Sequence, residues 1–505
     1  MSQAILLMLH NKINEQVYKL INYFQGKCDI FIHLDKDCKI SKQEILLMRE
    51  LPGVVGVYQK YHVHWAGYSM LKTEMYLLSI ALKHSNFRYV HLLSGQDYPI
   101  KPLAYFMWFF ENAEKEYIAC RHMPNPETDN NTFVRLQNIF LSDYLVPKND
   151  SDVSKLWNIA NKLAEKGIRR RIPDHFPHIY NGSQWFSLSR KIVEELVDYT
   201  KKQKSFYRRM KYVFAPEEIY INTFVKNNVP AELIHEDNLR YIYWPYPNAQ
   251  HPKVLTECDF CDIASSNAIF ARKIDIKESP QLVHKIDTLL LREESLSYSN
   301  DGICEQSTIW NYPYDRGLVS AIVYICNLLN IKNVWDLGCG PGFYVRNLLK
   351  EKIFSRGFDG NPNIRRISQM LNNSAFPCDC IKMHIPVTTD SNADMSLLLN
   401  VGEYISPELQ DIVLDNVCKL SKKYTIICWS DAANLTLLNN HEYFRFFEEN
   451  ADMSYIVNPL DDCELIKEMA VRGFIPDMII TDILRKNSIL PFHKMNITCF
   501  RRSDL

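Results

Sequence analysis

A glycine-rich turn deep inside the chain limits its architecture more than any other feature. The stretch NVWDLGCGPGFYV begins at Asn333 as a buried apolar strand and breaks after Asp336 into three glycines, Gly338, Gly340 and Gly342. Glycines at this spacing let the backbone turn tightly while a ligand approaches without meeting a Cβ. Such a turn opens a nucleotide-binding domain, yet a long stretch of chain precedes it. The chain must therefore hold another domain in front of this one.

Short apolar runs alternate with amphipathic stretches in the first half of the chain. Strands are predicted at 4–10, 28–35 and 88–95, with helices between them. One of these helices starts with a capping box formed by Ser41 and Glu44. A second alternation of the same kind surrounds the glycine turn. Alternating strands and helices form a mostly parallel sheet with helices on its faces, so both halves are predicted to be α/β.

The pattern changes near residue 290, where a helix gives way to the polar run SLSYSNDGICEQS. We place a domain boundary there, because few contacts cross such a segment. The predicted domains are residues 1–290 and 291–505, and each is long enough to bury its own core. No internal repeat relates them.

The composition excludes several classes of protein. Apolar residues make up 47% of the chain and charged residues 23%, as in an ordinary globular protein. The net charge of −1 provides no overall attraction to nucleic acid, so no nucleic-acid partner is expected. The first apolar run is too short for a signal peptide or a membrane span. We expect a cytoplasmic protein with its 14 cysteines reduced, and any membrane association to be peripheral, at the inner face.

A second acid follows the glycine turn, at the end of the next predicted strand. Asp359 ends the next predicted strand, in GFDGNP, where a carboxylate can accept both hydroxyls of a ribose. The glycine spacing differs from the G-x-G-x-x-G dinucleotide fingerprint, which disfavours NAD. Simple strand-end caps are the alternative interpretation of Asp336 and Asp359. Together the motifs resemble the class I S-adenosylmethionine-dependent methyltransferases, over about 300–505.

This resemblance implies a Rossmann-like domain and a set of cofactor-binding residues: Asp336, Gly338, Gly340 and Gly342 at the methionine end, Asp359 at the ribose, and Asn400 with Glu403 at the rim. Methyl transfer to oxygen also needs a group that takes the acceptor proton. His384, His441 and His493 are candidates, and the sequence does not choose among them.

Several short motifs occur in a fixed order in the first domain: HLDKD, YHVHWAGYS, SGQDYPIK, YNGSQWFSLSR, FAPEEIYINT, YIYWPYP and IFARK. In this order they resemble the Core-2/I-branching glycosyltransferase family, which contains β-1,6-N-acetylglucosaminyltransferases and peptide O-xylosyltransferases. The resemblance spans about 4–280. It implies a GT-A-type nucleotide-sugar-binding domain that inverts the anomeric centre, uses a UDP-sugar and needs no metal ion.

The same resemblance assigns the donor-binding residues. Asp35 matches the acid that contacts uracil, and Leu9 and His62 match positions near that base. Arg272 and Lys273 match the diphosphate-binding segment, where basic side chains must stabilise the leaving group when no divalent ion is present. A basic pair at the protein surface is the alternative interpretation of the last two.

The catalytic base and the acceptor contacts come from later motifs. The family's catalytic glutamate falls on Glu218, and Glu217 occupies the position of a neighbouring acid. Acids are also common in the first turn of any helix, which is the competing explanation. Trp244 and Tyr246 match aromatic residues that stack on the acceptor, and Trp185 lies in a segment lining the same cleft.

The leading hypothesis is a bifunctional enzyme of polysaccharide biosynthesis. It would transfer a sugar, with N-acetylglucosamine favoured, from a UDP-sugar to a glycan or glycolipid, and would methylate the same or a neighbouring glycan with S-adenosylmethionine. A xylosyltransferase is one alternative. The other is a glycosyltransferase whose C-terminal domain is a non-catalytic binding or assembly module.

Overall fold

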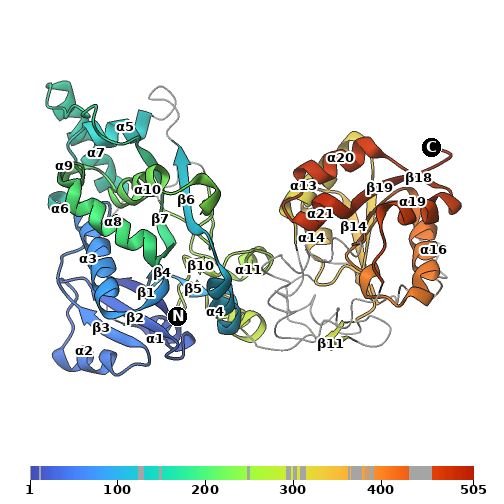
Figure 1. The fold of residues 1–505 in the computed structure, drawn as a ribbon, viewed down its shortest axis with the longest axis horizontal. Coiled ribbons are helices and arrows are strands. Elements are labelled where there is room, and N and C mark those ends of the chain that lie inside the picture. The colour runs from blue at the N-terminus through green and yellow to red at the C-terminus, as the bar shows by residue number, and fades with distance from the viewer. Residues whose placement is uncertain are drawn as a thin grey trace. The chain divides into compact units, whose positions relative to one another are not determined.

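The protein forms two compact units in a computed structural model, and each is considered by itself (Figure 1). The first comprises Met1–Glu257 and Asn267–Val283, the second Cys258–Ser266 and His284–Leu505. The structure describes residues 2–10, 13–122, 130–146, 150–246, 251–291, 297–298, 304–306, 314–361, 364, 378–380, 383, 386, 392–430 and 458–505. Our boundary near residue 290 adjoins residues outside this set and stays a prediction.

A seven-stranded sheet is the centre of the first unit, in the order β3-β2-β1-β4-β7-β6-β8 (Figure 1). Its parallel strands are β1 (Ser2–Leu9), β2 (Cys28–Leu34), β3 (Val54–Tyr58) and β4 (Phe87–Ser94). They are joined through α1 (Glu15–Tyr23), α2 (Lys42–Arg49) and α3 (Tyr68–His84). The predicted strands lie within two residues of these bounds. The capping box before α2 is confirmed, since Ser41 and Glu44 exchange hydrogen bonds.

The other half of this sheet also contains antiparallel pairs, although four of the six strand pairs of the whole sheet are parallel, as predicted. β7 (Tyr180–Ser189) runs antiparallel to β4 and to β6 (Glu116–His122), and β8 (Ile234–His235) is parallel to β6. A small second sheet contains β5 (Tyr98–Pro99), β10 (Phe270–Arg272) and β9 (Arg240–Ile242). Helices of this half are α4 (Leu103–Asn112), α8 (Arg190–Lys202), α9 (Lys204–Arg209) and α10 (Glu217–Asn228).

An insertion between β6 and β7 carries three helices, α5 (Asn130–Gln137), α6 (Ser142–Leu145) and α7 (Asp150–Glu165). It contacts the start of α3 through Asp143, whose carboxylate accepts the Ser69 hydroxyl at 2.5 Å. A Cβ placed on Gly67, the residue before α3, would lie 2.2 Å from the same carboxylate oxygen. A side chain at residue 67 would therefore require this carboxylate to move away from Ser69.

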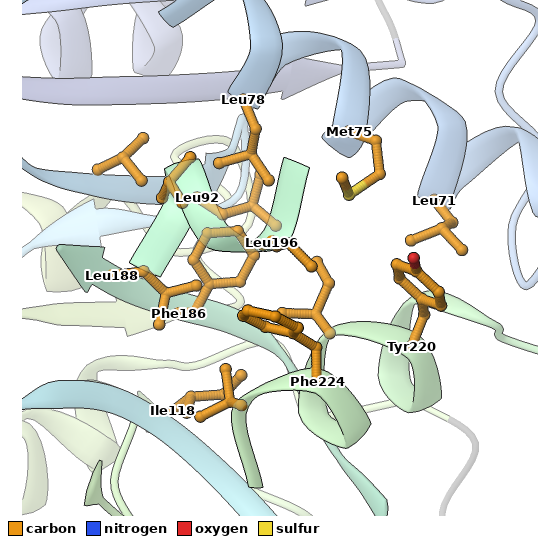
Figure 2. Packing of buried hydrophobic residues seen from close by; sticks show 14 of the residues in the cluster. Leu71, Met75, Leu78, Leu92, Ile118, Phe186, Leu188, Leu196, Tyr220 and Phe224 are labelled. Atoms are coloured by element: carbon orange, nitrogen blue, oxygen red, sulfur yellow. The ribbon is translucent and has the colours of Figure 1, made fainter. Parts of the chain in front are cut away.

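The main core of the first unit lies between the sheet and the helices α3, α8 and α10 (Figure 2). Leu71, Met75 and Leu78 of α3 face Phe186 of β7 and Phe224 of α10 in this core. Fully burying each such side chain contributes about 1.5–3 kcal/mol. Among the described residues of the chain, no helix combines the length and the apolar character needed to cross a membrane.

The second unit contains another seven-stranded sheet, in the order β15-β14-β13-β16-β17-β19-β18 (Figure 1). Its parallel strands are β13 (Asn333–Leu337), β14 (Phe354–Asp359), β15 (Cys378–Cys380), β16 (Ala393–Leu399) and β17 (Ser421–Cys428). β19 (Ile497–Arg502) is antiparallel to β17 and to β18 (Phe474–Pro476). The predicted α/β fold class, with a Rossmann-like second domain, is confirmed.

The second unit also contains the helices α13 (Arg316–Leu328), α14 (Phe343–Lys350), α16 (Gln410–Leu420), α19 (Asp462–Val471), α20 (Met478–Asn487) and α21 (Pro491–Asn496). α14 follows β13 directly through the glycine turn. The crossover helices connect parallel strands and keep the carboxyl ends of those strands at one edge of the sheet.

Asp315, at the start of α13, joins this helix to the segment between α20 and α21. Its buried carboxylate accepts the backbone N–H groups of Leu318, Ile489 and Leu490 at 2.9–3.1 Å, and the His493 ring at 3.0 Å. Burial alone would raise the pKa of Asp315, but the hydrogen bond from His493 and those from the backbone lower it below its ordinary value. Asp315 is thus an ionised group on which two distant segments depend.

Replacing Asp315 by Ala should destabilise the second unit by about 3–5 kcal/mol, because the buried N–H groups and His493 lose their acceptor. The lowered pKa means that the contribution of Asp315 is present at neutral pH and is lost as pH falls through its folded-state value. Hydrogen exchange of β13 and β16 amides would measure the loss. Asp482→Ala is the control, since Asp482 is exposed and lies 3.9 Å from Lys486. Equal stability of the two variants would contradict this role of Asp315.

Candidate functional site

The first candidate site lies at the carboxyl edge of the parallel strands in the first unit. The order of the sheet reverses there, since β2 and β3 extend it on one side of β1 and β4 on the other. Ligands of such sheets bind at this reversal, outside the carboxyl ends of the strands. Leu9 ends β1, and its carbonyl accepts the backbone N–H of Asp35 at 2.8 Å. Two residues predicted near uracil are therefore adjacent.

Asp35 fixes the loop that follows β2. One carboxylate oxygen accepts the N–H of Asp37 at 2.8 Å, and the other accepts that of Val63 at 3.1 Å. The buried His33 ring, two residues earlier, accepts the N–H of Tyr61 at 3.2 Å. Burial lowers the pKa of His33 to about 4, so its ring is neutral and can act as an acceptor. Each oxygen of Asp35 keeps a lone pair for a further donor.

His62 lies at the mouth of this loop. Its Nδ1 is 2.8 Å from the Asp37 carboxylate, and both side chains are exposed. Asp35, Asp37 and His62 each offer a ligand atom, and these atoms lie within 4.8 Å of one another. They are the group within the described part of the chain that could hold a metal ion. Metal independence and a uracil contact of His62 both stay predictions.

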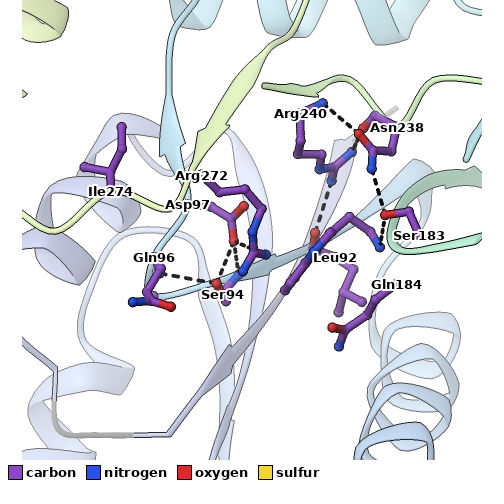
Figure 3. A network of polar contacts seen from close by, with 12 residues as sticks. Leu92, Ser94, Gln96, Asp97, Ser183, Gln184, Asn238, Arg240, Arg272 and Ile274 are labelled. Carbon is purple, nitrogen blue, oxygen red and sulfur yellow. Dashed lines mark hydrogen bonds and ion pairs between the residues drawn. The ribbon is translucent and has the colours of Figure 1, made fainter. Parts of the chain in front are cut away.

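Arg272 is fixed between the acid Asp97, as Figure 3 shows, and the aromatic ring of Trp185. Asp97, in the turn after β4, accepts the N–H and the hydroxyl of Ser94 at 2.7 Å, and its Oδ2 lies 3.5 Å from Arg272 Nη1. The Trp185 ring centroid is 3.7 Å from the guanidinium carbon. Burial lowers the pKa of Arg272 and Asp97 raises it, but the guanidinium stays charged. Trp185, predicted to line the acceptor cleft, contacts this cation.

His10 lies near Asp35 and Arg272, although no sequence motif predicts a role for it. Part of the His10 side chain is exposed to solvent, but protein atoms surround the rest of it. This partial burial lowers the pKa of the ring. Asp35 acts in the opposite direction, while Arg272 and Lys273 lower the pKa further. Burial and Arg272 also lower the pKa of Lys273. The cations matched to the diphosphate and the acid matched to uracil are therefore close enough to act on one histidine. Its position directly after β1 is the signal in the sequence that points to it.

Two buried side chains hold the loops of this edge together. Gln16 donates to the carbonyls of Gly95 and Ile274, each at 2.9 Å, which joins α1 to the turn after β4 and to the segment after β10. Arg240 donates to the carbonyl of Leu92 at 3.1 Å (Figure 3). These bonds link chain segments that are far apart in sequence. They therefore hold the segment with Arg272 and Lys273 in place relative to β4.

Glu218 lies in the first turn of α10, and Asn222 of that helix donates to the Ser183 carbonyl of β7 at 2.9 Å. The Glu218 carboxylate is 38% exposed and pairs with Arg135, with Nη2 and Oε2 3.0 Å apart. Glu217 beside it is buried, and burial first and then Glu218 raise its pKa well above the ordinary value. One of the two neighbouring acids is thus open to solvent. Catalysis by Glu218 stays a prediction.

Trp244 and Tyr246 lie in the loop after β9 and are 49% and 61% exposed. Tyr243 beside them is also exposed. Three exposed aromatic rings in four consecutive residues are unusual, since such side chains normally pack in the core. They offer flat apolar faces of the kind on which sugar rings stack. Their predicted acceptor contact is consistent with this exposure and is not tested by it.

The second candidate site is the glycine turn after β13. Gly338, Gly340 and Gly342 have φ angles of 78°, 50° and 78°, in the left-handed region that favours glycine. A Cβ on Gly338 would lie 2.3 Å from Cγ2 of Val401, which follows β16. The turn therefore lies against the end of β16, and the order of this sheet reverses between β13 and β16.

Two buried acids flank this turn. The Asp359 carboxylate accepts the N–H groups of Gly340 and Asn361, each at 2.8 Å, and burial raises its pKa. Asp336 is buried, and its Oδ2 has no hydrogen-bond partner among the described residues. Burial and then Asp359 raise the pKa of Asp336 to about 7. A buried carboxylate oxygen without a partner is costly unless a ligand supplies one.

These residues fit S-adenosylmethionine. The cofactor carries a sulfonium and an ammonium group, and a cationic ligand would stabilise the ionised form of Asp336. The glycine turn leaves the backbone open to a ligand, and Asp359 keeps lone pairs for ribose hydroxyls. The predicted assignments of Asp336, Gly338, Gly340, Gly342 and Asp359 remain predictions that this chemistry supports.

Asn400 connects the rim of this site to the interior. Its φ is 55°, its Nδ2 donates to Glu403 at 3.1 Å, and its Oδ1 lies 3.0 Å from Nε2 of His493. The other ring nitrogen of His493 contacts Asp315, and the ring is buried. Both nitrogens of His493 are thus occupied, which leaves it poorly placed to take a proton from a substrate. His384 and His441 lie outside the described residues.

Comparisons with known proteins agree with the family resemblance of the first half of the chain. A family model described as Core-2/I-Branching enzyme matches residues 6–266. The β-glucuronosyltransferase GlcAT14A of Arabidopsis thaliana is 25% identical over 286 residues, which cover 54% of this chain and 60% of that protein. GlcAT14B of the same plant is 23% identical, with 52% and 59% covered. The chain thus spans about three fifths of the length of these relatives.

Solved structures similar to the chain include magnesium protoporphyrin IX methyltransferase of Synechocystis PCC 6803 with bound SAH. It is 14% identical, the match covers 37% of this chain and 82% of that one, and the TM-score is 0.28. A likeness at this level carries no argument about activity. The description of the second unit rests on its own strand order and glycine turn.

Asp336→Asn should stabilise the second unit at pH 8 while weakening the binding of S-adenosylmethionine. A folded-state pKa near 7 means that the carboxyl group costs stability as pH rises from about 4 towards 7, by an amount on the order of 2–4 kcal/mol. The gain should vanish near pH 4. Thermal unfolding at both pH values and calorimetric titration with the cofactor would measure the effects. Asp482→Asn is the exposed control. Unchanged cofactor affinity would refute the assignment of Asp336.

Trp185→Ala should weaken the binding of UDP by about 5- to 30-fold, because a buried cation–π contact contributes on the order of 1–2 kcal/mol to the placement of Arg272. Trp185→Phe should retain most of the affinity. Calorimetric titration with UDP would show this, with the exposed Trp244→Ala as the comparison that leaves UDP binding intact. If Trp185→Ala binds UDP normally, the ring serves another purpose, such as its predicted acceptor contact.

Proposed function

Because the chain belongs to the Core-2/I-branching enzyme family, we propose that its first unit transfers a sugar from a UDP-sugar to a hydroxyl of a glycan or glycolipid. The observation that carries this proposal is that Asp35, Arg272 and Lys273 all lie near enough to His10 to influence its pKa. A uracil-binding acid and diphosphate-binding cations need this proximity. The family match covers the same residues, 6–266.

Inversion at the anomeric carbon needs a base on the side opposite the nucleotide. Glu218 would take the proton of the acceptor hydroxyl as that oxygen forms its bond to the sugar and the bond to the diphosphate oxygen breaks. Arg272 and Lys273 would stabilise the charge that develops on the diphosphate. The exposed rings of Trp244 and Tyr246 would stack on the acceptor. In this scheme no metal ion is required.

The donor sugar has two leading candidates. N-acetylglucosamine follows from the resemblance of the motifs to the acetylglucosaminyltransferases of the family. Glucuronic acid is the second, because both curated relatives are β-glucuronosyltransferases by name. Xylose remains an alternative. Discrimination between such sugars depends on a few contacts to ring substituents.

For the second unit we propose methyl transfer from S-adenosylmethionine. The cofactor would supply an electrophilic methyl group. The glycine turn would take its methionine end, Asp336 would lie beside its positive charge, and Asp359 would accept its ribose hydroxyls. The partnerless Oδ2 of Asp336 supports a working pocket over a non-catalytic assembly module, because an unused buried carboxylate only destabilises the fold. The module remains the alternative.

Fusion of the two units would favour action on one glycan. A product held by one unit is presented to the other at a high effective concentration. We propose that this glycan belongs to a surface polysaccharide assembled in the cytoplasm, at the inner face of the membrane, with the enzyme associated peripherally. This placement rests on analogy.

Incubation with UDP-N-acetylglucosamine, UDP-glucuronate and UDP-xylose tests the first activity. The true donor should raise the melting temperature by mass action and should release UDP. Glu218→Gln should lower the rate by about 100- to 10,000-fold and leave donor binding intact. Glu232→Gln, on an exposed acid, is the matched control. EDTA should not change the rate. A full rate in Glu218→Gln would refute the proposed base, and loss of activity in EDTA would direct attention to Asp35, Asp37 and His62.

A further inference from the structure

We propose that Arg135 is a positioning residue for Glu218, held on the insertion between β6 and β7, and that it fixes the carboxylate that takes the acceptor proton. The inference rests on the proposed role of Glu218 as general base. It assigns a function to the insertion, which contains α5, α6 and α7 and to which neither the sequence motifs nor the family resemblance gives a role.

The guanidinium of Arg135 is oriented before it meets the carboxylate. Its Nε donates to the carbonyl of Phe214 at 2.8 Å, and its Nη2 donates to that of Ala215 at 2.7 Å. The same Nη2 donates to Glu218 Oε2 at 3.0 Å. Because the guanidinium is planar, two backbone bonds determine the direction of the third. The carboxylate thus meets a donor whose position is already set.

The turn that supplies these carbonyls is itself held. Ala215 has a φ of 47°, and its N–H donates to the carbonyl of Ala66 at 2.9 Å. The Phe214 ring packs against Trp65 and Phe140, with centroids 5.5 and 5.6 Å apart. The insertion supplies Phe140 as well as Arg135. The guanidinium, the turn and the start of α10 therefore form one rigid arrangement.

Exposure separates this ion pair from an ordinary surface pair. The Arg135 side chain is 10% exposed and that of Glu218 is 38% exposed. Exposed pairs contribute little to stability, because water competes for both charges. Here the Arg135 cation is shielded from water while the Glu218 carboxylate is open to solvent. This exposure is expected of a carboxylate that must receive a proton from a substrate.

Two other acids face this pair from the interior. Glu217 of α10 and Glu74 of α3 are buried, and each has a carboxylate oxygen without a hydrogen-bond partner in the part of the chain that the structure describes. Gln184 donates to the other oxygen of Glu74 at 2.7 Å. Burial is the main cause of the raised pKa of both acids. It raises the pKa of Glu74 to about 8 and the pKa of Glu217 well above its ordinary value. Burial thus favours the neutral form of both acids, which leaves the charge of Arg135 available to Glu218.

The rate of the catalysed step tests this role. Without Arg135 the Glu218 carboxylate loses the donor that holds its direction. Arg135→Gln in the full chain should therefore lower kcat by about 10- to 100-fold, as expected when a catalytic group is misplaced. The readout is UDP release from whichever of the three UDP-sugars is turned over fastest. The KM for this donor should change less than about twofold, because Glu218 acts on the acceptor side.

Two further variants keep the test decisive. Arg135→Lys retains the charge without the planar fork, so it should also lower kcat and leave the KM for the donor unchanged. This variant decides the matter if Arg135→Gln is less stable. Arg171→Gln is the matched control, since Arg171 pairs with Asp174 at 3.0 Å and the two side chains are 83% and 88% exposed. The kcat and KM of this control should equal those of the unchanged protein.

The outcomes separate this inference from the proposed function. An unchanged kcat in Arg135→Gln, with Glu218→Gln inactive, overturns the inference alone. A wild-type kcat in Arg135→Lys also overturns it, because the fork would then be unnecessary. Full UDP release by Glu218→Gln removes the base and with it the reason for a positioning residue.

Discussion

In both units, a carboxylate at the carboxyl end of a parallel strand accepts backbone N–H groups of the loop beside it, and the candidate sites depend on these bonds. Asp35 fixes the loop after β2 through Asp37 and Val63. Asp359 fixes the glycine turn through Gly340. Because each carboxylate oxygen can accept more than one hydrogen bond, one side chain can hold several backbone groups of a loop in place. The loops can then present their remaining donors and acceptors to a ligand without further ordering.

Local features could be predicted from the sequence because neighbouring residues determine them. The parallel strands β1, β2 and β4, the capping box at Ser41 and the acids at strand ends belong to this class. The stack of Trp185 on Arg272 and the pair of Arg135 with Glu218 do not, since they join segments more than 80 residues apart and depend on how the sheet closes. The same reason explains the mixed first sheet, because nothing near β7 in the sequence shows that it pairs antiparallel with both neighbours.

Burial of acids without full compensation recurs at both sites. Glu74, Asp336 and Glu403 each keep one oxygen without a partner among the residues described. Desolvation favours their neutral form, so each has a raised pKa. Selection for stability alone would replace such groups with neutral ones, which makes their presence informative about function. Asp315, in contrast, is buried with all its bonds made, and it serves the fold.

The contact between Gly67 and Asp143 has a consequence for how such chains can diverge. A side chain at position 67 would occupy the space of the Asp143 carboxylate, which also accepts the Ser69 hydroxyl. A substitution at any of these three positions therefore changes what the other two can be. We expect the three positions to vary together among homologues, while the His64 carbonyl, 3.0 Å from a Cβ at position 67, disfavours a side chain there as well.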